Sequence, residues 1–118
     1  MAYDSDNVFA KILRGELPCN KVYEDDYALA FHDIAPEAPI HVLVVPKGKY
    51  LSFDDFVKNA DSGFVRDFFQ SVQKVAEYLK LPEEGYRIIS NHGEAAAQSV
   101  SHFHVHIIGG KKLGRLLP

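Results

Sequence analysis

The sequence predicts an α+β domain built on a mainly antiparallel sheet of five strands, with one long helix and one short helix. Three observations lead to this fold class: five short extended segments, a single long amphipathic stretch, and no regular alternation of strands with helices. A chain of 118 residues is long enough for one hydrophobic core, so residues 1–118 are expected to form a single domain.

The first predicted element is a short helix over residues 8–13. Apolar side chains recur there at helical spacing, behind the candidate N-caps Ser5 and Asp6. Gly15 follows at a position where it can end the helix. The short helix is therefore predicted from an N-cap, an apolar face and a glycine that can end it.

Three extended segments follow. Residues 21–24 and 27–32 flank a pair of aspartates, which favours a hairpin-like turn between two strands. Residues 41–45 are rich in β-branched side chains and end at Pro46, which cannot donate to a strand ladder. These segments supply the first three strands of the predicted sheet.

The second half of the chain contains the long helix and the last two strands. Apolar residues fit a 3.6-residue period over residues 63–80, and Pro82 and Gly85 end this helix. Residues 86–90 and 101–108 are predicted as the fourth and fifth strands. The wide apolar stripe of the helix is expected to cover one face of the sheet.

Composition and charge narrow the classes of partner. The formal net charge of −3 gives no electrostatic reason to expect a nucleic acid or an anionic membrane as partner. Cys19 is the only cysteine, so no intrachain disulfide can form, which favours a reducing compartment. No basic and apolar leader and no bilayer-length apolar run is present, so we expect a cytoplasmic protein.

Three of the six histidines alternate with apolar residues near the end of the chain. Side chains alternate between the two faces of a strand, which places His102, His104 and His106 on one face. The apolar residues between them then face the core. Three imidazoles in a row exceed what packing requires, and this pattern indicates a function.

Three interpretations of the alternating histidines follow from the residues alone. They are ordinary surface residues, they bind a metal such as zinc, or they carry out nucleophilic catalysis on phosphorus. Three same-face positions span about 13 Å along a strand, which is awkward for one ion unless the strand bends. A neutral imidazole is a good nucleophile near pH 7, and a neighbouring histidine can donate to the leaving group.

The stretch from His102 to Ile108 resembles the His-φ-His-φ-His-φ-φ signature of the histidine triad superfamily. Its flanks resemble the HINT branch of purine nucleoside phosphoramidases within that superfamily. The flanking matches are Phe9-Ala10-Lys11-Ile12, Tyr23-Glu24-Asp25-Asp26, Ala30-Phe31-His32-Asp33-Ile34, Ala38-Pro39-Ile40-His41, Val45-Pro46-Lys47, Asn91-His92-Gly93, Gln98-Ser99-Val100 and Gly109-Gly110.

The resemblance implies a hydrolase that cleaves purine nucleoside 5′-phosphoramidates, of the adenosine 5′-monophosphoramidate type, through a nucleotidyl-histidine intermediate. It implies the fold of that superfamily and a homodimer that joins two five-stranded sheets into a ten-stranded one. It implies a purine nucleoside monophosphate or phosphoramidate as ligand, and neither a cofactor nor a metal.

The resemblance also assigns catalytic roles to five residues. His104 is the nucleophile, His106 lies at the scissile bond, and Ser99 contacts the phosphate or the leaving amine. The main-chain carbonyl of His102 fixes the tautomer of His104. His41 is expected to pair with His102.

The nucleotide-binding residues are implied in the same way. Asp33 takes the ribose hydroxyls, and Asn91 orients the ribose and phosphate. Backbone N–H groups of residues 97–99 hold phosphate oxygens that His104 and His106 also approach. The base is expected to lie against Phe9, Ile12, Phe31, His32 and Ile34, and the loop residues are Ala97, Gln98 and Ser99.

The chain departs from the HINT pattern at two places. Ala97 stands where many members have glycine, and the added methyl restricts the approach of the backbone to phosphate. The end of the chain, residues 111–118, lacks the tryptophan-containing tail of animal members. Both departures concern rate and leaving-group preference and leave the class of reaction unchanged.

Other functions stay open at this point. The same superfamily includes dinucleoside polyphosphate hydrolases, and its nucleotidyl transferases have glutamine in place of the third histidine, which His106 argues against. A metal-dependent hydrolase that uses the alternating histidines is a further alternative. A nucleotide-binding or scaffolding protein with incidental activity is the remaining one.

Overall fold

The computed structural model describes residues 2–116 and has the predicted α+β architecture. The elements are α1 (Val8–Leu13), β1 (Lys21–Glu24), β2 (Ala28–His32), β3 (Ile40–Pro46), α2 (Phe53–Asn59), α3 (Ser62–Tyr78), β4 (Arg87–Ile89), the short 3₁₀ turn η1 (Glu94–Ala96) and β5 (Val105–Gly109). The five strands form one sheet in the order β1-β2-β3-β5-β4, and every neighbouring pair is antiparallel. This confirms the predicted five-stranded antiparallel sheet.

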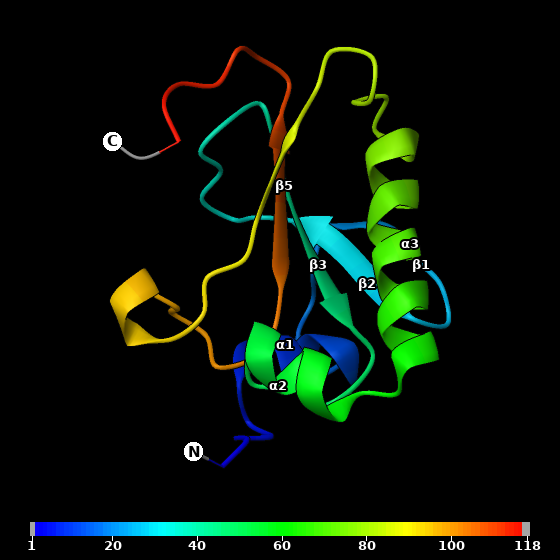
Figure 1. The fold of residues 1–118 in the computed structure, drawn as a ribbon, viewed down its shortest axis with the longest axis vertical. Helices are drawn as coiled ribbons and strands as arrows, with labels where there is room; N and C mark the ends of the chain where they lie inside the picture. The colour runs from blue at the N-terminus through cyan, green and yellow to red at the C-terminus, as the bar shows by residue number, and fades with distance from the viewer. Residues whose placement is uncertain (1, 117–118) are drawn as a thin grey trace.

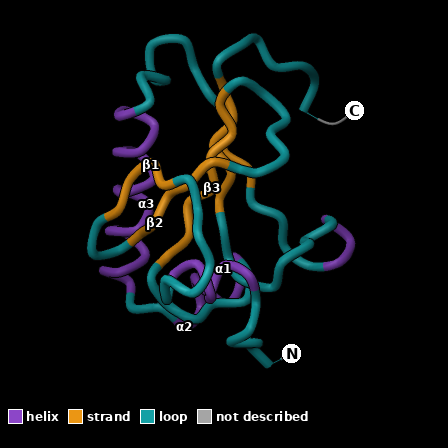
Figure 2. Tube along the Cα trace, turned by 180° about the vertical axis from the view of Figure 1, so that it is seen from behind, coloured by secondary structure: helices purple, strands orange, loops and turns teal. Residues whose placement is uncertain are grey.

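Helices pack against both faces of this sheet. On one face, α2 and α3 contribute Phe56, Phe68 and Val72 to the larger hydrophobic cluster, against alternate residues of β2, β3 and β5. Figure 1 shows α3 in front of β1 and β2, and Figure 2 shows the same strands in front of α3 when seen from behind. On the other face, Phe9 of α1 packs against Phe31 and its neighbours in a smaller cluster.

The long helix is confirmed, but its end differs from the prediction. The last helical residue is Tyr78, and Lys80 takes a left-handed conformation with φ of 61°. Leu81 then donates its N–H to the carbonyl of Ala76, which closes the helix with an αL cap. The helix therefore ends before Pro82 and Gly85, the residues expected to stop it.

Two further differences concern helix starts. The N-cap of α1 is Asn7, in place of Ser5 or Asp6, and its side chain accepts the N–H of Ala10. The sequence analysis also missed α2, a second short helix that begins after Ser52. The signal was present in the sequence, because a serine three residues before an acidic residue is a preferred helix start. Ser52 accepts the N–H of Asp55, and Asp55 accepts the N–H of Leu51, the residue before the cap.

The fifth strand begins later than predicted. The ladder starts at Val105, so His102 and His104 precede it, and only His106 lies within the strand. The reason is that the stretch 102–104 bonds outside the ladder: Phe103 donates its N–H to the carbonyl of Tyr50. The alternation still holds for the apolar residues, because Phe103, Val105 and Ile107 are all buried in the larger cluster.

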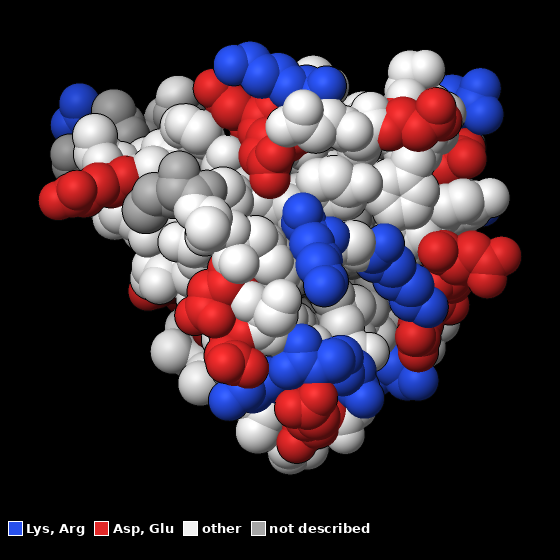
Figure 3. All heavy atoms as spheres, turned by 90° about the horizontal axis from the view of Figure 1, so that it is seen from below, with Lys and Arg blue, Asp and Glu red and all other residues white. Residues whose placement is uncertain are grey.

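The surface carries charges of both signs. Figure 3, viewed from the end where α1 and α2 lie, shows lysine and arginine interspersed with aspartate and glutamate on that face. Within residues 2–116, no helix has the length and apolar character that crossing a membrane requires.

Candidate active site

His104 is held in one tautomer by the backbone. Its Nδ1 lies 2.7 Å from the carbonyl oxygen of His102, and the ring is only 6% exposed. A carbonyl can only accept a hydrogen bond, so Nδ1 carries the proton and Nε2 keeps its lone pair. The ring packs edge-on against Phe9 of α1, with ring centroids 4.9 Å apart. The result is a buried imidazole with a free, oriented nitrogen.

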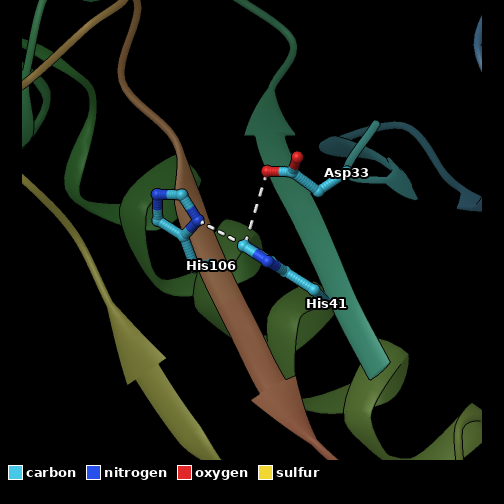
Figure 4. A group of neighbouring side chains, drawn as sticks. All are labelled: Asp33, His41 and His106. Carbon is cyan, nitrogen blue, oxygen red and sulfur yellow. Dashed lines mark hydrogen bonds and ion pairs between the residues drawn. The ribbon is translucent and has the colours of Figure 1, made fainter. Parts of the chain in front are cut away.

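His106 is held in the opposite tautomer by a chain of hydrogen bonds. The N–H of Glu37 donates to Nδ1 of His41 at 3.0 Å, which leaves the proton of His41 on Nε2. Figure 4 shows this Nε2 between His106 and Asp33, 2.9 Å from Nδ1 of His106 and 3.4 Å from a carboxylate oxygen of Asp33. Nδ1 of His106 therefore accepts, and its Nε2 carries a proton.

The partner of His41 corrects one expectation. His41 was expected to pair with His102, but its ring bonds His106. The physical reason is register: β3 pairs with β5 so that Leu43 lies opposite His106, and His41 is two residues from Leu43 on the same face. His102 precedes β5 and therefore takes no part in the pairing of β3 with β5.

Burial keeps the three rings of the triad neutral. Burial, together with repulsion from His104, lowers the pKa of His102 to about 4. Burial and the neighbouring His104 and His41 likewise lower the pKa of His106 to about 4, against a smaller opposite effect of Asp33. The pKa of His104 is lowered by burial, while its bond to the His102 carbonyl and Asp33 act in the other direction. At neutral pH the site therefore offers one lone pair and one N–H donor.

A metal could be held by only one group of residues within 2–116, and it differs from the alternating histidines. Asp33, His41 and His106 place one ligand atom each within 4.8 Å of one another. Nε2 of His41 lies 2.9 Å from Nδ1 of His106 and 3.4 Å from a carboxylate oxygen of Asp33. Two ligand atoms on the same tetrahedral zinc ion are expected to lie about 3.3 Å apart, which is close to both distances. His102 and His104 point to other partners, so the metal site suggested by the alternation is not formed by the three histidines together.

A mostly apolar cavity of about 570 Å³ lies next to these rings. Five of its lining residues are those expected to contact a base: Phe9, Ile12, Phe31, His32 and Ile34. Asp33 and Ser99 line it as well. His104 adjoins the cavity through Phe9, and His106 adjoins it through Asp33, to which it comes within 4.8 Å. The side chain of Ile34 is fully exposed at this cavity.

Residues 97–99 were expected to offer their backbone N–H groups to phosphate oxygens, but most of these groups bond within the loop. The N–H of Ala97 donates to the carbonyl of Glu94, and the N–H of Gln98 donates to the carbonyl of Gly93. Two of the three N–H groups expected to hold phosphate are thus already engaged. The side chain of Gln98 also stays within the fold, donating to the carbonyls of Leu51 and Val100.

Asn91 is likewise engaged within this loop. Its amide donates to the carbonyl of Ala96 at 2.9 Å, and it does not line the cavity. Ala97 itself adopts the left-handed conformation, with φ of 59° and ψ of 41°. Alanine has a steric cost in this conformation that glycine would not have.

Two residues that the sequence analysis missed hold His102. The hydroxyl of Tyr3 lies 2.7 Å from Nδ1 of His102, and the amide of Asn7 lies 3.4 Å from the same atom. Nothing in the local sequence pattern signals Tyr3. Asn7 could have been found as a cap, because asparagine immediately before an apolar helical run is a preferred N-cap.

The chain is similar to known proteins over most of its length. A family model for the HIT domain matches residues 14–113. An uncharacterised HIT-like protein of Azospirillum brasilense is 51% identical over 115 residues, which cover 98% of this chain and 94% of that protein. A solved histidine triad protein from Clostridium difficile is 41% identical with a TM-score of 0.86, covering 97% of this chain and 98% of the other. A HIT family hydrolase from Legionella pneumophila is 37% identical with a TM-score of 0.84, at coverages of 91% and 95%.

Proposed function

The chain belongs to the HIT domain family, and from this premise we propose that it is a nucleotide-binding hydrolase of the HINT branch that cleaves purine nucleoside 5′-phosphoramidates. One observation carries the proposal: the rings of His104 and His106 are adjacent, with centroids 5.0 Å apart, and only one of the two carries a proton on Nε2. His104 offers a lone pair, and His106 offers a proton. A nucleophile beside a proton donor suits the displacement of an amine from phosphorus.

In the first step, the Nε2 lone pair of His104 bonds to the α-phosphorus and the phosphorus–nitrogen bond breaks. The departing amine takes a proton from Nε2 of His106, and the ring holds a second proton on Nδ1 at this moment, taken up from solvent with the substrate. The Nε2–H of His41 then faces the carboxylate of Asp33, 3.4 Å away, in place of Nδ1 of His106. The negative charge of the bound phosphoryl group and of Asp33 favours the imidazolium, against the burial that lowers the pKa of His106 to about 4. The carbonyl of His102 stabilises the cationic nucleotidyl-imidazole through Nδ1–H.

In the second step, water attacks the phosphorus of the nucleotidyl-histidine. The bond to His104 breaks and returns the lone pair to Nε2, and His106 takes one proton of the water. The products are a nucleoside monophosphate and the free amine, and His106 is again protonated for the next cycle. Asp33 supports the charge of His106 in both steps, and His41 holds the ring of His106 in place while that ring is neutral.

The cavity supports a purine nucleotide as ligand. Its apolar wall suits a flat aromatic base, and Asp33 lies at its edge, next to His41 and His106. The carboxylate already accepts the N–H of Ala35, but two carboxylate oxygens offer about four acceptor sites, enough for ribose hydroxyls as well. Ser99 lines the same cavity, in reach of a phosphate or a leaving group placed there.

The experiment that tests the proposal is turnover of adenosine 5′-monophosphoramidate by the wild type and by His104→Ala. The variant is expected to lose about a thousandfold or more in kcat and to keep nucleotide binding. Wild-type protein quenched during turnover should carry one nucleoside monophosphate, mapped to His104 by peptide mass. His92→Ala is the matched control, because His92 is half-exposed and pairs only with Asp54. Equal turnover by wild type and His104→Ala would instead indicate a binding or scaffolding protein.

Two rival reactions can be distinguished from the proposed one, the first by comparing substrates and the second by measuring zinc. A higher kcat/KM for diadenosine triphosphate than for the phosphoramidate would assign the chain to the dinucleoside polyphosphate hydrolases. A metal-dependent hydrolase is the second candidate, and the cluster of Asp33, His41 and His106 is the observation that favours it. Stoichiometric zinc in the active protein, with loss of activity on chelation, would support that candidate over ours.

We also propose that two copies join edge to edge into a ten-stranded sheet. β4 is an edge strand of the sheet, and the side chain of Ile88 on it is 50% exposed. Tyr78 at the end of α3 is exposed as well, so apolar surface lies on the two elements that the family resemblance assigns to the interface. Light scattering should give twice the monomer mass, and the monomer mass alone would refute this assembly.

A further inference from the structure

The segment that precedes α1 lies against the first histidine of the triad. His102 has no exposed surface, and its ring stacks at a tilt of 58° on Tyr3, with centroids 5.6 Å apart. The Tyr3 hydroxyl and the Asn7 amide both approach Nδ1 of His102, at 2.7 and 3.4 Å. Both residues lie outside the range 14–113 that the HIT domain model matches.

The direction of these hydrogen bonds follows from the cap of α1. The side-chain oxygen of Asn7 accepts the N–H of Ala10 at 2.9 Å, so its amide nitrogen faces His102. An amide nitrogen only donates, and therefore Nδ1 of His102 accepts and the Tyr3 hydroxyl donates to it. The proton of His102 is then on Nε2, which is buried without a hydrogen-bond partner among residues 2–116.

This arrangement makes Tyr3 the principal anchor of the His102 ring. Among residues 2–116, the hydrogen bonds of the ring are made at Nδ1, because Nε2 has no partner, and the bond from Tyr3 is the shorter of the two. The stretch 102–104 also precedes the ladder of β5, so few backbone bonds hold it. The same residue, His102, supplies the carbonyl that holds Nδ1 of His104.

We propose that Tyr3 is a positioning residue of the active site: its hydroxyl fixes the ring of His102, and the His102 carbonyl thereby fixes the tautomer and direction of His104. The catalytic part of this inference rests on the proposed function, in which His104 is the nucleophile. The structural part, the chain from Tyr3 through His102 to His104, is measurable without any substrate.

The test is Tyr3→Phe, which removes the hydroxyl and keeps the ring that packs on His102. Loss of one buried hydrogen bond is expected to lower kcat about five- to tenfold, with KM for adenosine 5′-monophosphoramidate within about twofold of wild type. The matched control is Tyr23→Phe, which removes a hydroxyl bonded to Asp25 at 2.9 Å on β1 and should leave kcat unchanged. A general loss of stability would affect both variants, whereas a positioning role affects only the first.

The second readout is NMR of protein with ¹⁵N-labelled histidine. In the wild type, His104 should show a proton on Nδ1 and His102 a proton on Nε2. In Tyr3→Phe, the Nδ1–H signal of His104 should broaden or shift as the second tautomer becomes populated. An unchanged His104 signal, or an unchanged kcat, overturns the inference.

The two readouts keep this inference separate from the proposed function. Absence of turnover by the wild type refutes the proposed reaction, and the His104 signal in Tyr3→Phe still decides whether Tyr3 positions that ring. Turnover by the wild type together with full activity of Tyr3→Phe supports the reaction and refutes the role of Tyr3.

Discussion

Replacing His41 tests whether the hydrogen-bond chain that orients His106 contributes to the reaction. His41→Ala removes a ring that is 5% exposed and breaks three contacts: one from the N–H of Glu37, one to Nδ1 of His106 and one, at 3.4 Å, to the carboxylate of Asp33. The substitution leaves the cavity wall intact, because His41 does not line it. We therefore expect the effect on kcat to exceed the effect on KM.

The magnitude follows from the bond to His106 that is lost. A neutral hydrogen bond contributes about 1 kcal/mol. Both rings are neutral while His41 donates to His106, so losing about 1 kcal/mol of positioning lowers kcat roughly fivefold. The unpaired N–H of Glu37 and the space left by the ring should also lower the free energy of unfolding by about 2–4 kcal/mol.

The assay is steady-state turnover of adenosine 5′-monophosphoramidate, with urea unfolding of the same samples. The control is His92→Ala, which deletes a half-exposed imidazole away from this cluster and should leave both quantities close to wild type. A kcat for His41→Ala within twofold of wild type, in a folded protein, would refute the role of the chain from Glu37 through His41 to His106.

Three further predictions concern stability and the cavity. Lowering the pH from 7 to 5 should lower the free energy of unfolding by about 2 kcal/mol for each of His102 and His106, because folding lowers their pKa to about 4 and the unfolded chain then binds more protons. Equal urea midpoints at both pH values would contradict this. Ala97→Gly should raise the free energy of unfolding by about 0.5–1 kcal/mol, since it relieves a left-handed alanine, and a lower midpoint would contradict it. Adenosine monophosphate should slow alkylation of the exposed Cys19, which lines the cavity, whereas equal rates with and without it would place the nucleotide elsewhere.

The fold was predictable because its signals are local. The helical period of α3 and the β-branched run of β3 appear within a few residues of sequence, and both elements lie where they were expected. The missed helix α2 is shorter, and its signal lies in the Ser52 cap, outside the apolar periodicity on which the element assignments relied. Element ends were the least accurate. The end of α3 lies at a left-handed Lys80, a conformation that side chains other than glycine rarely adopt, and β5 begins late because Phe103 bonds Tyr50 outside the ladder.

Most residues of the candidate site could be predicted from the sequence, but the hydrogen bonds between them could not. The five residues expected to form an apolar wall do line one cavity, together with Asp33 and Ser99. The expected pairing of His41 with His102 was wrong, and the N–H groups of Ala97 and Gln98 are engaged within the loop. The catalytic roles of these residues stay predictions until the proposed variants are measured.

The sequence alone determined the alternation of histidines with core residues and the order of the elements, because period and spacing are properties of neighbouring residues. Its resemblance to the histidine triad superfamily identified the residues that surround the cavity. Only the tertiary structure decided which nitrogen of each imidazole carries a proton. That choice depends on partners far along the chain, 65 residues away for His41 and His106, and 99 residues away for Tyr3 and His102. Contacts of this kind are set by strand register and by the docking of the N-terminal segment, and neither leaves a local pattern.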